Sequence, residues 1–134
     1  MVKQCRYAII LLCLTSVVLS SCAGAPERDP DALFRFYDAP LAQVQEAAGQ
    51  GLQRLNLDIF EDSTGRHYLQ GGRHSEFTGR GETVTVWLEE ADAGSTTVWI
   101  ATRKPGWVWR GAFIDWSPKL FDHIQQDIRT RIRG

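Results

Sequence analysis

The chain has 134 residues, in which 15 Lys and Arg stand against 16 Asp and Glu, for a formal net charge of −1. A chain of this length fits one domain rather than two. The near balance of charge leaves no basic surface of the kind that nucleic-acid-binding domains carry, so we expect no nucleic acid partner.

The first 21 residues have the three parts of an export signal. Lys3 and Arg6 form a short positive segment, and residues 7–19 form a largely apolar one. Ser20 and Ser21 then supply the small side chains that a signal peptidase accepts before the cut. An uncleaved membrane helix is a poor alternative, because spanning a bilayer takes about 20 apolar residues. An ordinary secretory signal is the other alternative.

The sequence Leu-Ser-Ser-Cys at residues 19–22 resembles the lipobox of bacterial lipoprotein signal peptides. The resemblance implies that Cys22 becomes the first residue of the mature protein, with a diacylglyceryl group on its sulfur and usually an acyl chain on its amine. Two or three acyl chains hold a protein stably, because each buried CH₂ contributes about 0.8 kcal/mol. Since Ala23 and not Asp follows the cysteine, the resemblance also implies the periplasmic leaflet of the outer membrane.

We therefore divide the chain into a signal peptide (1–21), a lipidated cysteine with a flexible tether (22–32) and a single domain (33–134). The tether is small, charged and interrupted by Pro26 and Pro30, so it cannot bury enough surface to fold. Cleavage would leave 113 residues, with 13 basic residues against 16 acidic ones, because two basic residues leave with the signal.

Cysteine use fits this division. Cys5 and Cys13 lie in the signal peptide, and acylation would occupy the thiol of Cys22. No thiol then remains for a disulfide or a cysteine metal site. We expect no cofactor, and a domain stabilised by packing alone.

The order of expected elements predicts the fold class. They are a strand at 33–37, a helix at 41–55, a strand at 57–62 with a turn at 63–65, a bulged or broken strand within 66–81 that continues through 76–78, a hairpin of 82–90 and 96–103, an aromatic connection at 104–116 and a last helix from 117. Two amphipathic helices can cover one face of an antiparallel sheet. We expect a two-layer α+β sandwich with about four or five strands and both helices on one face.

The first helix has an apolar stripe and two glycines. Asp38 is expected to cap it, with Pro40 in its first turn. Gly49 and Gly51 each weaken a helix by up to about 1 kcal/mol relative to alanine. Either they allow a close approach to another backbone or the helix frays there. The stripe consists of Leu41, Val44, Ala48, Leu52 and Leu55.

The last helix is expected to begin with Ser117 as N-cap and Pro118 in its first turn. Arginines gather at its C-terminal end, where the helix dipole favours positive charge. Its apolar face consists of Leu120, Phe121, Ile124, Ile128 and Ile132.

Tryptophans mark a candidate binding surface. The hairpin alternates, so its valines and leucine would face the helices and Trp87 and Trp99 would face away. A turn at 91–95 would place these two directly opposite each other. The pair either stabilises the hairpin or lies buried under the connection at 104–116, or else it is exposed and binds a partner. The candidate surface consists of Trp87, Trp99, Trp107, Trp109 and Arg110.

The sequence carries no catalytic motif and no metal-ligand spacing. Residues 67 and 74 would face opposite sides of a regular strand, which argues against a shared metal. A hydrolase acting on cell-wall material would need two carboxylates, or a carboxylate and a histidine, in one cleft. The candidates for such a site are Glu76, Glu82, Asp115, His67, His74 and His123.

The domain also resembles small bacterial lipoproteins that belong to families of unknown function. The resemblance rests on the element order, on Asp-Ala-Pro-Leu at 38–41 and on Val-Thr-Val-Trp-Leu-Glu at 84–89. With the lipobox, it implies a protein anchored to the cell envelope. We expect a non-enzymatic binding or assembly module that contacts an envelope protein, glycan or lipid. A cell-wall hydrolase using Glu or Asp and His is the alternative.

Overall fold

The fold is built on one antiparallel sheet. The computed structural model describes residues 27–75, 79–104 and 114–134. The strands lie side by side in the order β1-β5-β4-β3-β2, so β1 and β2 form the two edges. The elements are β1 (Leu33–Tyr37), α2 (Leu41–Arg54), β2 (Asp58–Ser63), the 3₁₀ helix η1 (Thr64–Arg66), β3 (Tyr68–Ser75), β4 (Gly79–Asp92), β5 (Ser95–Arg103) and α3 (Ser117–Arg133).

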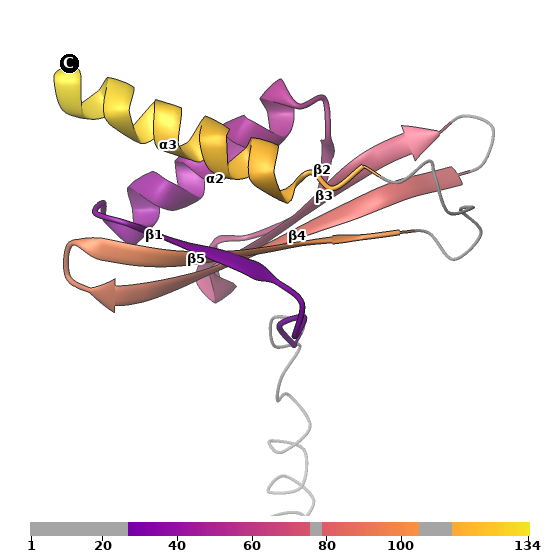
Figure 1. Cartoon of the computed structure of the whole chain (residues 1–134), viewed down its shortest axis with the longest axis horizontal. Coiled ribbons are helices and arrows are strands. Elements are labelled where there is room, and N and C mark those ends of the chain that lie inside the picture. Colours follow the sequence, from indigo (N-terminus) through magenta and orange to yellow (C-terminus); the bar gives the residue numbers. More distant parts are fainter. Residues whose placement is uncertain (1–26, 76–78, 105–113) are drawn as a thin grey trace, which may run out of the picture.

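Both helices lie on the same face of the sheet, and the other face carries no helix among the described residues (Figure 1). The predicted two-layer α+β fold, with a sheet of four or five strands and two helices on one face, is therefore confirmed. The core fills the space between the layers. Its most deeply buried members include Val84, Val86, Val98 and Ile100 from the sheet and Val44, Leu52, Leu120 and Ile124 from the helices.

The two helices approach each other closely at Gly51. A Cβ added there would lie 2.7 Å from Leu120 Cδ1, whereas one added at Gly49 would meet no atom within 4 Å. Gly51 therefore packs tightly against side chains of α3, whereas the expected approach to another backbone is not observed at either glycine.

An ion-pair network also joins the helices at the surface. The guanidinium of Arg131 donates to both carboxylate oxygens of Glu46 at 2.9 Å and, through Nε, to Asp127 at 2.8 Å. Arg54 at the end of α2 lies 3.5 Å from the other oxygen of Asp127. The hydrogen bonds from Arg131 hold the pKa of Glu46 below its ordinary value.

Neither helix is capped as the sequence suggested. The N-cap position of α2 is occupied by Pro40, with no side-chain cap hydrogen bond, so the expectation for Asp38 is wrong. At α3 the N-cap position is Trp116, and Ser117 is the first helical residue. The N–H of Ser117 instead donates to Asp115 Oδ1 at 3.0 Å. A carboxylate two residues earlier thus accepts from one of the N–H groups that the first turn of a helix leaves without an intrahelical partner.

The apolar face of α3 is buried except at its end. Ile132 is 71% exposed, which corrects the expectation that it belongs to the core. The last turn of α3 rises away from the sheet (Figure 1), so a side chain there has no strand to contact. The four residues of this face that are buried as expected are Leu120, Phe121, Ile124 and Ile128.

The glycine-rich stretch forms the ends of two strands rather than one. The β3–β4 pairing shifts between Gly72 and His74, which is the predicted bulge. A side chain on Gly72 would collide with the backbone carbonyl of Glu82 on β4. Gly79 already belongs to β4, so this strand begins three residues before the expected start at 82. The expected continuation of the preceding strand through 76–78 lies outside the described residues.

Candidate functional site: an aromatic surface on the uncovered sheet face

Two tryptophans lie opposite each other on the sheet face that no described helix covers, as the alternation predicted; we call it the uncovered face. Trp87 of β4 pairs with Trp99 of β5. Their neighbours Val86, Val98 and Ile100 point the other way and are completely buried under the helices.

The edge strand β1 adds two phenylalanines to this face. Phe34 pairs with Trp99 and Phe36 with Thr97, so both side chains point away from the helices. The rings of Phe34 and Trp99 are 4.8 Å apart between centroids, tilted by 37°. We call the four residues Phe34, Phe36, Trp87 and Trp99 the aromatic surface.

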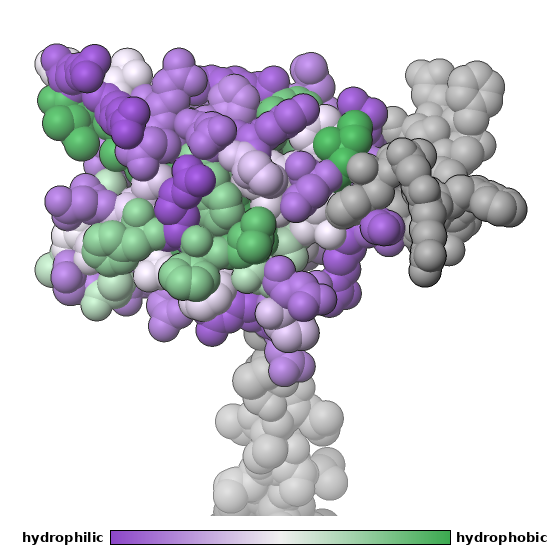
Figure 2. Space-filling model, in the orientation of Figure 1, coloured by the Kyte–Doolittle hydropathy of each residue, from purple (hydrophilic) through white to green (hydrophobic). Residues whose placement is uncertain are grey.

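The phenylalanines are the exposed part of the aromatic surface. Phe34 is 65% exposed and Phe36 is 56% exposed, while Trp87 and Trp99 are half-buried. Leu33, at the start of the same strand, is 49% exposed. Figure 2 shows hydrophobic side chains gathered over the position of β1. Single exposed apolar residues are ordinary, but adjoining ones on one strand form a patch of the kind that binds partners.

Residues just before β1 are held against the same face. The guanidinium carbon of Arg28 lies 4.0 Å from the centre of the Trp99 ring, and its Nη1 lies 3.5 Å from a carboxylate oxygen of Glu89. Asp29 accepts a hydrogen bond of 3.1 Å from Arg103 Nε at the end of β5. The pKa of Asp29 is lowered by the backbone N–H of Asp31 and by this guanidinium. The chain therefore enters the domain across the uncovered face.

The structure tests only part of the candidate surface. Trp87 and Trp99 come together as predicted, whereas Trp107, Trp109 and Arg110 lie outside the described residues, as does Cys22. Sequence reasoning left Phe34 and Phe36 out of the surface. Their two-residue spacing showed that they share a side, but the spacing did not show that β1 pairs with β5 and brings them beside Trp99.

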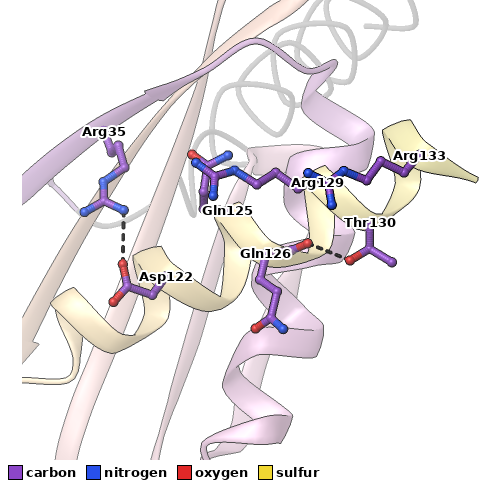
Figure 3. Close-up of a pocket in the computed structure, with 7 residues that line it drawn as sticks. All are labelled: Arg35, Asp122, Gln125, Gln126, Arg129, Thr130 and Arg133. Atoms are coloured by element: carbon purple, nitrogen blue, oxygen red, sulfur yellow. Dashed lines mark hydrogen bonds and ion pairs between the residues drawn. The ribbon is translucent and has the colours of Figure 1, made fainter.

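A second feature, which the sequence did not indicate, is a groove of about 720 Å³ between β1 and α3 (Figure 3). Arg35 pairs with Asp122 at 3.4 Å and lies over the ring of Phe121, 4.9 Å from its centre. Within the described part of the chain, Arg129 and Arg133 have no ion-pair partner. The groove therefore carries an excess of positive charge and attracts anions. Its lining is completed by Gln125, Gln126 and Thr130.

The hydrolase candidates whose side chains the structure describes are not brought together. His67 lines a pocket between α2 and β2 with Glu46 and Asp62, while Asp115 lines a different pocket at the start of α3. Glu82 is buried, and no pocket found among the described residues joins it to a histidine. The lowered pKa of Glu46 keeps this carboxyl ionised, which is the opposite of what a general acid needs.

Among the remaining candidates, only His123 has a described side chain. His123 lies in α3 where that helix passes Gly51 of α2. Residue 76 lies outside the described residues, and the side chain of His74 is not described. In residues 27–75, 79–104 and 114–134, no group of three or more His, Cys, Asp or Glu side chains could hold a metal ion.

No protein-family model and no curated protein matches the sequence of this chain. In the part of the chain that the structure describes, neither helix has the length and apolar character needed to cross a bilayer. A function is best inferred from two features, the aromatic surface and the place where the chain enters the domain.

Proposed function

We propose that the protein is an envelope lipoprotein, anchored by acylated Cys22 in the periplasmic leaflet of the outer membrane. Its domain acts as a non-enzymatic binding or assembly module. The anchor is supported by the signal-like residues 1–21 and by their Leu-Ser-Ser-Cys ending. A short tether fits this role, because β1 begins at Leu33, eleven positions after the cysteine.

The aromatic surface is the observation on which the binding role rests. Phe34 and Phe36 are more than half exposed on a sheet face that carries no helix among the described residues. Apolar area left in water costs about 25 cal/mol per Å², and a partner that covers it recovers that free energy. Aromatic and arginine side chains are also enriched at protein interfaces. In this protein the guanidinium of Arg28 lies over the ring of Trp99, a member of the aromatic surface.

Photo-crosslinking in cells tests the binding role. A photoreactive p-benzoylphenylalanine replaces Phe36 in one strain and Ile132 in another. Ile132 is a matched control because it is an exposed apolar residue, 71% exposed, on the helix layer instead of the uncovered face. We expect adducts with an envelope component at position 36 and few at position 132. Equal yields at the two positions would exclude the aromatic surface as a binding site.

Metabolic labelling with an alkyne analogue of palmitate tests the anchor separately. We expect the wild-type protein to be labelled and to sediment with outer membranes. Replacing Cys22→Ala should abolish the label and leave the precursor unprocessed, because the acylated sulfur is missing. Persistence of the label in this variant would refute the assignment of the anchor.

A further inference from the structure

The tether reaches the domain on the face that bears the aromatic surface. Arg28 lies over Trp99, and Asp29 is paired with Arg103 of β5. Figure 1 shows the segment that precedes β1 on the side of the sheet opposite the helices. The N-terminal segment therefore leaves the domain from its uncovered face.

The tether is also short. Cys22 and Arg28 are six positions apart, and six residues span at most about 22 Å even when fully extended. If Cys22 is embedded at the membrane surface, Arg28 lies within that distance of it. Trp99, which Arg28 contacts, is then held close to the lipid headgroups. The helix layer lies on the opposite side of the sheet from the segment that precedes β1.

We propose that the aromatic surface rests on the lipid bilayer in which the protein's own anchor is embedded. This inference rests on the proposed acylation of Cys22. Phenylalanine side chains enter the boundary between headgroups and acyl chains, and tryptophan favours the same zone because its ring is apolar and its N–H is polar. The guanidinium of Arg28 lies over the Trp99 ring and pairs with Glu89, so it places a polar, charged group at the margin of the aromatic surface.

A second copy that paired along the free edge of β1 is disfavoured in the register centred on Arg35. An antiparallel β1–β1 pair centred on Arg35 would place each Arg35 opposite its counterpart. Like charges directly opposite each other destabilise a pair of strands. A bilayer imposes no such repulsion on the edge strand.

The contact with lipid does not need to be strong. The anchor already confines the domain to the membrane surface, so docking of the aromatic surface is an intramolecular step with a high effective concentration. Phe34 and Phe36, with exposed fractions of 65% and 56%, offer the apolar area that such a contact buries.

Depth-dependent fluorescence quenching of the acylated protein tests the inference. The mature chain has no free thiol when Cys22 is acylated, so Phe36→Cys and Ile132→Cys each introduce one labelling site for the fluorophore NBD. The labelled proteins are reconstituted into vesicles of phosphatidylethanolamine and phosphatidylglycerol at 3:1, with or without lipids that carry a nitroxide. We expect a blue-shifted emission at position 36 and at least about twofold stronger quenching there than at position 132, since interfacial insertion reaches the acyl boundary. Equal quenching at both positions would overturn the inference.

Two further readouts separate the possible failures. A protein that does not float with the vesicles would refute the acylated anchor, and with it the proposed function. A protein that floats but shows no quenching at position 36 would leave the anchor intact and refute only the lipid contact. A tenfold dilution of protein in lipid should leave the blue shift unchanged; its loss on dilution would identify a second copy as the partner and overturn the proposal.

Discussion

Gly49 and Gly51 of α2 form a matched pair that tests how the helix layer is packed. Replacing Gly49→Ala should stabilise the domain by up to about 1 kcal/mol, because alanine loses less backbone entropy in a helix. The new methyl group meets no atom within 4 Å. Replacing Gly51→Ala brings the same gain in helix propensity but places the methyl carbon 2.7 Å from Leu120 Cδ1.

The crowding at Gly51 sets the difference between the two variants. Leu120 is completely buried, so its side chain can move only into the packed core. Overpacking of this kind costs about 1–3 kcal/mol, which offsets or exceeds the gain in propensity. At roughly 4 °C per kcal/mol for a domain of this size, Gly51→Ala should melt about 4–12 °C below Gly49→Ala.

Thermal melts and urea titrations of the two variants measure this difference. Leu120→Ala alone should destabilise the domain by about 2–5 kcal/mol, and its cost should be smaller when alanine occupies position 51, since the shorter side chain leaves room for the methyl group. If Gly51→Ala stabilises the domain as much as Gly49→Ala does, the close contact between α2 and α3 is refuted.

Three other predictions follow from the fold. Burial raises the pKa of Tyr37 to about 12. The contribution of this shift to the free energy of unfolding is therefore complete below the ordinary pKa of 10.0 and is lost as pH rises through 12. Tyr37→Phe should make the free energy of unfolding less dependent on pH in this alkaline range. The pKa of Glu46 is lowered by Arg131, so its contribution is present above its ordinary pKa of 4.5 and is lost as pH falls through the lowered value. Glu46→Gln should therefore reduce the dependence of the melting temperature on acid, and an unchanged acid profile would argue against the ion pair. The double variant Phe34→Ser/Phe36→Ser should leave the melting temperature nearly unchanged, because both side chains are exposed. Crosslinking or lipid contact at the uncovered face should be lost. A large fall in melting temperature would show that the two phenylalanines have a structural role instead.

Local alternation was sufficient to predict the hairpin and its two faces. The pattern around Trp87 and Trp99 determines which side chains face the helices, and a turn of known length fixes which residues lie opposite each other. The helices followed in the same way from their apolar spacing. These features depend on residues that are close in the sequence.

The features that the sequence did not reveal depend on distant residues. The pairing of β1 with β5 brings Phe34 beside Trp99, and the groove at Arg35 forms only when α3 packs beside that strand. Ile132 has the spacing of a core residue, yet its burial depends on the angle at which α3 crosses the sheet. The predicted cap of α3 was wrong for a different reason. Asp115 lies just outside the helix and accepts a hydrogen bond from the N–H of Ser117.

The central claim is that Cys22 anchors this domain through covalent lipid. Mass spectrometry of the N-terminal peptide, from protein extracted with mild detergent out of cell membranes, tests it most directly. The proposed function predicts a peptide that begins at Cys22 and carries the added mass of a diacylglyceryl group, with or without a further acyl chain on the amine. A peptide that begins at another residue, or one that begins at Cys22 with a free thiol, would contradict it.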